Sequence, residues 1–316
     1  MTLPVSIFKQ CRGEIIMRNY SLGELLPALV FGSLCFVWGS TWLAIKVGLG
    51  SLPPLLFAGI RFVIAWGLLL AYALVMRINF PVDKTSWRVM LFLGVTQIAL
   101  PYALVFWGEQ YVTAGLAAVL FATVPFFVAL FAHFIIPDER LTAWKLSGIL
   151  VSFIGVTIIF SRELMLTDSS FLGGLALIVA AGSAGCANVV GKKYSRSINS
   201  IVNLVVQMGV GALLLTAGGI IFERNVSLNL GQTSVLMVLY LGVIGSAFAF
   251  VALYWLFTRM EVTRVSLFTF ITPIVAVVLG WLILGEKVDL NVVVGGSLIL
   301  LGVILVNQMP KMSGKI

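Results

Sequence analysis

Charged side chains are scarce in this sequence. Only 10% of its 316 residues are Asp, Glu, Lys or Arg, whereas a soluble domain carries about 25%. The chain has a single histidine, His133, and three scattered cysteines, Cys11, Cys35 and Cys186. Such counts exclude a disulfide framework and argue against a histidine- or cysteine-ligated metal. The sequence therefore predicts no metal site and no cofactor, and it argues against a water-soluble enzyme.

Apolar residues fill most of the chain. They make up 60% of the sequence, and the mean hydropathy is +1.11. A helix that crosses a bilayer needs about 20 apolar residues, and ten runs approach that length. The ten predicted spans are residues 25–45, 54–75, 89–107, 114–136, 143–160, 171–191, 201–222, 235–257, 262–284 and 288–306. Because these spans and their short loops use nearly the whole chain, the sequence predicts an all-α integral membrane protein with ten transmembrane helices and no soluble domain.

The basic residues are distributed asymmetrically between the loops. If the N-terminus is cytoplasmic, 15 Lys and Arg residues fall in cytoplasmic segments, 4 fall in outer segments and Arg61 lies within a span. Cytoplasmic loops are enriched in Lys and Arg, so both tails, 1–24 and 308–316, are predicted to be cytoplasmic. The net charge of +8 is thus a topology signal, and it predicts no nucleic-acid partner.

The two halves of the sequence form an internal repeat. A shift of about 148 residues places Trp107 on Trp255 and Pro125 on Pro273, and upstream of them the shift is 146. Each half contains five predicted spans, an odd number, so the second half would be inverted in the membrane relative to the first. Inverted repeats are typical of alternating-access transporters, whose substrate site lies between the repeats.

Several segments resemble a known family. They are the first-span stretch FVWGSTWLAIKVGL and the paired segments PDERLTAWKLSGILVSFIGVTIIF and GEKVDLNVVVGGSLILLGVIL. Over residues 25–307 the chain resembles the ten-helix EamA family of the drug/metabolite transporter superfamily. The resemblance implies two five-helix repeats, at 25–160 and 171–307. It also implies export or exchange of amino acids, other metabolites or toxic compounds across a bacterial inner membrane.

Arg61 is the only basic residue well inside a predicted span. An intramembrane charge is costly and faces either a partner or a water-filled cavity. One interpretation is an anchor for an anionic group, such as the carboxylate of an amino acid. The other is a structural pair with Glu109 or with carbonyl groups at a helix end.

Other polar and aromatic residues within the spans could line a substrate cavity. Amides at mid-span either bridge helices or face a cavity, and tryptophans either bind solutes through their rings or belong to the interfacial aromatic belt. The cavity candidates are Trp38, Ser40, Thr41, Trp42, Arg61, Gln97, Trp107, Asn203, Gln207, Tyr254 and Trp255.

Two further groups concern coupling and movement. Glu109 and His133 are the candidate proton carriers, although each lies near a membrane edge from which its side chain could reach water. Pro125 and Pro273 interrupt the hydrogen bonding of their spans and would act as hinges or as static bends.

Structural roles are predicted for two glutamates and four glycines. Glu139 and Glu286 are expected to cap the helices that follow them. Glycines two turns apart in spans five and ten would allow close helix packing, either at the periphery or at a homodimer contact. These glycines are Gly148, Gly155, Gly295 and Gly302.

The sequence thus predicts a secondary transporter that moves a small-molecule substrate through the bilayer by alternating access. The family resemblance makes export the expected direction and amino acids the leading substrate class. Efflux of aromatic or cationic toxic compounds is the alternative within transport, and a non-transporting membrane scaffold is the alternative outside it.

Overall fold

The computed structural model describes residues 10–11, 14–15, 22–81, 83–137, 142–163, 168–194, 198–226, 230–257, 259 and 268–307. Apart from two paired strands, β1 (Gln10–Cys11) and β2 (Glu14–Ile15), the regular structure of this part of the chain is helical. Glu139, the tail 308–316 and most of the tail 1–24 lie outside the described residues.

The first half of the chain contributes the helices up to residue 163. They are α1 (Leu22–Leu49), α2 (Pro54–Val75), α3 (Lys84–Leu93), η1 (Gly94–Ala99), α4 (Leu100–Gly108), α5 (Ala114–Phe121), α6 (Val124–Ile135) and α7 (Ala143–Glu163). The N-termini of α3 and α5 are capped by side chains, since Asp83 accepts from the Ser86 amide and Thr113 from the Leu116 amide. Such caps satisfy amides that have no partner within the helix.

The second half follows the same order. Its helices are α8 (Asp168–Tyr194), α9 (Ser200–Phe222), α10 (Gln232–Leu239), η2 (Tyr240–Phe248), α11 (Ala249–Phe257), α13 (Phe268–Leu284) and α14 (Leu290–Asn307). The elements η1 and η2 are π-helical, and each continues directly from one α-helix into the next.

The surface of the bundle is apolar. Phe222, Phe134 and Leu213 are 80%, 74% and 69% exposed, and apolar side chains this exposed over many helices indicate a lipid-facing surface. Within the described residues, seven helices or continuous runs of helices are long and apolar enough to cross a membrane. Three shorter apolar helices, Ala143–Ile159, Ile271–Leu284 and Leu290–Leu305, lie within the predicted fifth, ninth and tenth spans, and residues 262–267 of the ninth lie outside the described residues. The chain is therefore a multi-pass membrane protein, and the count of ten spans stays a prediction.

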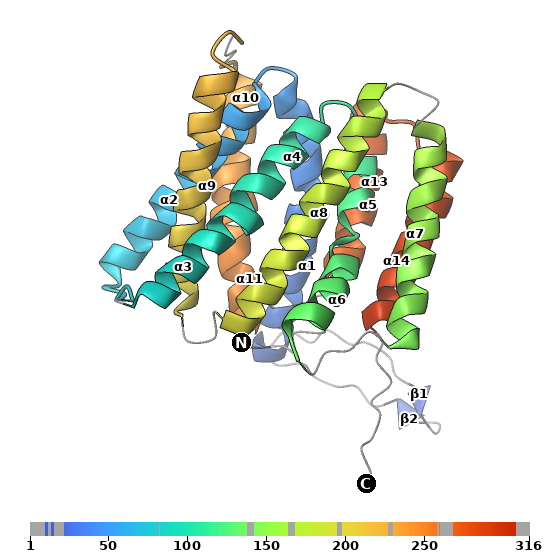
Figure 1. The fold of residues 1–316 in the computed structure, drawn as a ribbon, viewed down its shortest axis with the longest axis horizontal. Helices are drawn as coiled ribbons and strands as arrows, with labels where there is room; N and C mark the ends of the chain where they lie inside the picture. The colour runs from blue at the N-terminus through green and yellow to red at the C-terminus, as the bar shows by residue number, and fades with distance from the viewer. Residues whose placement is uncertain are drawn as a thin grey trace.

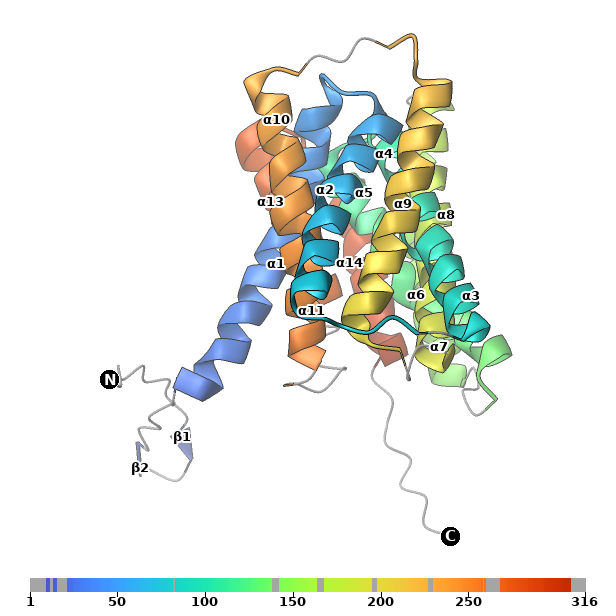
Figure 2. The same cartoon turned by 90° about the vertical axis from the view of Figure 1, so that its left-hand side faces the viewer.

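Helices from the two halves are interleaved rather than separate. α2 packs against α9, α7 against α14, α1 against α13, and α6 against α8. Figure 1 shows α7 and α14 side by side at one edge of the bundle. In both views α1 begins and α14 ends at the same end of the bundle (Figures 1 and 2). The core of the protein is thus built from contacts between the halves.

Three of the predicted spans are not single uninterrupted α-helices. The third and eighth contain the π-helical segments, and the fourth is divided by a turn at Ala122 and Thr123. Pro125, which has no amide hydrogen to donate, lies at the start of α6 directly after that turn. Pro101 likewise follows η1 within the third span. By contrast, α13 continues through Pro273.

The regularly spaced glycines bring α7 and α14 into backbone contact. A Cβ atom at Gly155 would meet the carbonyl oxygen of Gly295, and one at Gly302 would meet that of Gly148. Ser152, between the two glycines of α7, donates a hydrogen bond of 3.3 Å to the carbonyl oxygen of Ile299. The glycines therefore have the predicted packing role. The contact that they allow joins the two halves of the same chain.

We expect Gly155→Val to destabilise the protein, because the new side chain would overlap the α14 backbone. Overpacking of this kind costs about 1–3 kcal/mol. The midpoint of thermal unfolding in detergent measures the effect. Gly67→Ala is the matched control, since no atom lies within 4 Å of a Cβ built there. Equal midpoints for the two variants would contradict the close contact.

Candidate functional site

A cavity lies in the middle of the helix bundle. Its volume is about 220 Å³. Side chains from α1, α2, η1, α4, α5, α6, α8, α11 and α13 line it, so both halves of the chain contribute to its wall. Small-molecule sites often lie where two parts of a fold meet and between the helices of a bundle, as this cavity does.

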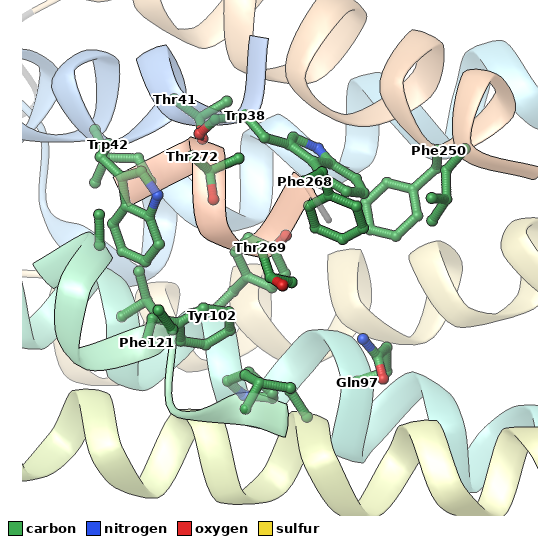
Figure 3. Close-up of a pocket in the computed structure, with 18 of the residues that line it drawn as sticks. Trp38, Thr41, Trp42, Gln97, Tyr102, Phe121, Phe250, Phe268, Thr269 and Thr272 are labelled. Carbon is green, nitrogen blue, oxygen red and sulfur yellow. The ribbon is translucent and has the colours of Figure 1, made fainter. Parts of the chain in front are cut away.

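Aromatic rings form two clusters in the cavity wall. Trp38 packs against Phe250 and Phe268, with ring centroids 5.6 and 4.6 Å apart, while Trp42 lies 5.5 Å from Phe121. Figure 3 shows the Trp38 cluster on one side of the cavity, and Trp42 with Phe121 on the other. The one-turn spacing of Trp38 and Trp42 on α1 places both indoles at the cavity, as the predicted cavity role of this pair requires.

Polar groups are interspersed among the rings. Thr41, Gln97 and Thr272 line the cavity, as do Asn188 and Thr269. In Figure 3 the two α13 threonines, Thr269 and Thr272, lie between the aromatic clusters. The wall is therefore amphipathic, with hydroxyl and amide groups available beside ring faces.

Arg61 is the only charged residue among the described residues that line the cavity. Its side chain is 1% exposed. Nε donates to Ser246 Oγ at 2.7 Å, and Nη2 donates to the carbonyl oxygen of Gly245 at 3.3 Å. The guanidinium carbon lies 4.9 Å from the ring centroid of Tyr102 and 5.2 Å from that of Phe62. Nη1 has no hydrogen-bond partner in the described part of the chain.

Gly245 belongs to the π-helical segment η2, and its carbonyl group is shared. It accepts from Arg61 and also from Trp38 Nε1, at 3.3 Å in each case. A π-helical segment shifts the hydrogen-bond register of a helix, and such segments are frequent at functional sites. Neither structural partner that the sequence suggested for Arg61 is the one in the structure: the Gly245 carbonyl lies within η2 and not at a helix end, and the Glu109 carboxylate makes no hydrogen bond to Arg61.

The structure brings five of the predicted cavity residues to this cavity and leaves six outside its described wall. Those in the wall are Trp38, Thr41, Trp42, Arg61 and Gln97. Those outside it are Ser40, Trp107, Asn203, Gln207, Tyr254 and Trp255.

The six residues outside the wall make other contacts. Ser40 Oγ lies 2.6 Å from the Tyr240 hydroxyl. Asn203 and Gln207 are each 5% exposed, within the helix contacts of α9. Trp107 is 37% exposed and packs on Tyr111, with ring centroids 5.1 Å apart. Tyr254 interacts with the Asn203 side chain, and the Arg259 guanidinium carbon lies 5.2 Å from the ring centroid of Trp255.

The two candidate proton carriers differ in their surroundings. His133 lies exposed in the last turn of α6. Glu109 lies directly after α4 and is 0% exposed. The suggestion that the Glu109 side chain reaches water is therefore wrong in this structure, because neighbouring helices enclose it.

Sequence reasoning missed several residues of the cavity wall, although the internal repeat could have found them. Six pairs of lining residues are separated by the repeat shifts of 146 or 148. The pairs are Trp38 with Ala184, Trp42 with Asn188, Tyr102 with Phe250, Val105 with Leu253, Phe121 with Thr269, and Val124 with Thr272. Twelve of the twenty described lining residues therefore occupy equivalent positions of the two halves, and the paired residues differ in identity.

Carboxylates from the second half cap helices of the first half at the end of the bundle opposite the start of α1. Glu223 accepts from the amides of Leu55 and Leu56 at 2.8 and 2.9 Å. Glu286 accepts from the amides of Ala114 and Gly115 at 2.8 and 3.3 Å. We call this end the capped end. The prediction that Glu286 caps the helix following it is wrong, since the carboxylate stabilises α5 instead.

The apolar helices and their central amphipathic cavity define a multi-pass membrane protein with a solute-sized site between its halves. The chain belongs to the EamA-like transporter family, which matches residues 26–161 and 171–308. It is thus a membrane transport protein, and the family resemblance noted in the sequence is confirmed.

Similar proteins are named as transporters. The "Uncharacterized transporter YoaV" of Bacillus subtilis is 30% identical over 274 residues, which covers 86% of this chain and 94% of that protein. The "Uncharacterized inner membrane transporter YedA" of Escherichia coli K12 is 30% identical over 275 residues, covering 84% and 86%. A solved crystal structure shares the fold, with a TM-score of 0.63 and 20% identity, and covers 89% of this chain and 97% of that one.

Proposed function

We propose that this protein is a secondary transporter that exports small amphipathic metabolites by alternating access. Amino acids with an apolar or aromatic side chain are the leading substrates. The observation that carries the proposal is the cavity between the halves, with Arg61 Nη1 unpartnered among the described residues and tryptophans in the same wall. Lys and Arg are concentrated in the segments that are cytoplasmic if the N-terminus is cytoplasmic. We therefore place both termini on the cytoplasmic side of a bacterial inner membrane and the capped end on the outer side.

The repeat supports the alternating-access mechanism. Two inverted five-helix halves can exchange conformations, so that a state open on one side becomes its counterpart open on the other. Repeat-equivalent residues line the cavity in pairs, and α2 packs on α9 and α7 on α14, which are equivalent helices. A solute bound between the halves would then face each side of the membrane in turn.

The chemistry of the cavity supports a substrate with one anionic group and one apolar part. A guanidinium group binds a carboxylate through charge-assisted hydrogen bonds, and Arg61 has one donor nitrogen without a partner in the described chain. Ring faces such as those of Trp38 and Trp42 suit an apolar or aromatic side chain. A zwitterionic amino acid carries both features.

Efflux of aromatic or cationic toxic compounds is the second candidate, because tryptophan rings stack on aromatic groups and also bind cations. The charge of the cavity disfavours the cationic compounds among them. The described lining residues contain one arginine and no carboxylate, so a cation would enter a site that already holds a positive charge.

Counterflow in proteoliposomes tests the proposal. Vesicles containing the full-length protein and loaded with unlabelled L-phenylalanine should accumulate external labelled L-phenylalanine, since exchange through an alternating-access site requires no energy source. L-Lysine and tetraphenylphosphonium, which carry a net positive charge, should compete weakly. Strong competition by tetraphenylphosphonium would favour cation efflux, and absence of counterflow over a panel of amino acids and other small metabolites would overturn the transport proposal.

A further inference from the structure

Glu109 has a buried carboxylate without a hydrogen-bond partner. It follows the last residue of α4 and is 0% exposed, and neither Oε1 nor Oε2 has a partner within the described residues. Glu223 and Glu286, two other carboxylates at the capped end, differ from it, because each accepts two backbone amides. The environment of Glu109 therefore lacks the amide donors that its neighbours have.

Lys46 does not donate a hydrogen bond to the Glu109 carboxylate. Lys46 Nζ donates to the carbonyl oxygens of Glu109, Gln110 and Val112 at 2.7, 3.3 and 2.6 Å. An ammonium group has three hydrogens, so all three are used by the backbone after α4. Lys46 thus stabilises the carbonyl end of that helix and leaves the Glu109 carboxylate unsatisfied.

The remaining charges around Glu109 come from other elements. Within the described chain, the charged groups that act on it are Lys46 on α1, Arg61 on α2 and Glu286 in the loop before α14. Arg61 directs its bonded donors to Ser246 and Gly245, while Glu286 adds a charge of the same sign. The end of α4 contributes the negative pole of the helix dipole, which also disfavours an anion.

A carboxylate that is buried and unpaired takes up a proton, because the neutral form is far less costly to bury than the ion. We propose that Glu109 is a proton-binding site, protonated while the capped end encloses it and ionised when that end opens. The proton comes from water, forms an O–H bond to one carboxylate oxygen, and returns to water when the bond breaks. This inference rests on the proposed transport function, since opening of the capped end is a step of that cycle.

Infrared spectroscopy of the full-length protein in lipid vesicles tests the site without any substrate. At neutral pH the wild type should show the carbonyl stretching band of a protonated carboxyl group, and Glu109→Gln should lose it. Glu223→Gln and Glu286→Gln are matched controls that should keep the band, because they change a carboxylate at the same end and leave Glu109 in place. A band that persists in Glu109→Gln, or that is missing from the wild type, would overturn the inference.

A Glu109→Asp variant covers the case in which Glu109→Gln does not fold, since it should shift the band rather than remove it. The pH profile of L-phenylalanine counterflow gives a second readout, which Glu109→Gln should flatten and a purely structural role would not. An unchanged profile in the variant contradicts the inference. If the wild type shows no counterflow of any tested metabolite, the transport proposal fails, and the infrared result still decides whether Glu109 binds a proton.

Discussion

Replacing Arg61 with glutamine should weaken the apparent affinity for L-phenylalanine in counterflow by roughly 10- to 100-fold, while leaving the fold intact. A hydrogen bond to a charged group contributes about 1.5–3 kcal/mol, and each 1.4 kcal/mol is about a tenfold change in affinity. Glutamine is also the residue at the repeat-equivalent position, Gln207. Its amide can still donate to Ser246, which accepts from Arg61 in the wild type.

Thermal unfolding separates this role from a structural one. Arg61 is a buried charge without an ionic partner among the described residues and with Nη1 unsatisfied, so neutralising it should leave the unfolding midpoint equal or higher. Arg77→Gln is the matched control, because Arg77 follows the same helix but is exposed. Retained transport with a much lower midpoint in Arg61→Gln would identify Arg61 as a structural anchor instead.

Replacing Glu286 with alanine should produce the largest loss of stability among the capping residues. The substitution leaves the amides of Ala114 and Gly115 without their acceptor, and both residues are buried. An unsatisfied buried amide costs about 1–3 kcal/mol. The effect should extend to the contact between the halves, since the carboxylate comes from the second half and α5 from the first. The unfolding midpoint in detergent measures it.

Two variants sharpen this test. Glu286→Gln should lose less stability than Glu286→Ala, because the amide oxygen still accepts one of the two hydrogen bonds. Lys287→Ala removes the exposed neighbouring charge and should leave the midpoint unchanged. If Lys287→Ala lowers the unfolding midpoint as much as Glu286→Ala does, the hydrogen bonds of the Glu286 cap contribute nothing measurable to stability.

The sequence predicted the helical membrane fold because its signals are local. Apolar runs such as 54–75 and 201–222 coincide with α2 and α9 almost residue for residue. The π-helical segments were not predicted, because a shift of hydrogen-bond register leaves little trace in composition. The turn before α6, by contrast, could be expected from the sequence, because Pro125 lies directly after it.

The candidate site was predicted in part. Trp38 and Trp42 were found through their spacing on one helix face, and Arg61 through its cost in the membrane. Phe250, Phe268 and the α13 threonines were missed because phenylalanine and threonine are ordinary in apolar helices. Only the alignment of the two halves distinguishes Phe250, which is equivalent to Tyr102.

The sequence by itself determined that the chain is a membrane protein of repeated design, since hydropathy and internal repetition are properties of residue order. The tertiary structure alone decided the partners of each polar group. Glu286 caps α5 rather than the following helix, and Lys46 bonds to backbone carbonyls rather than to the Glu109 carboxylate. Such choices depend on which helix ends meet across the bundle, and residues more than sixty positions apart in the chain carry no local signal of that contact.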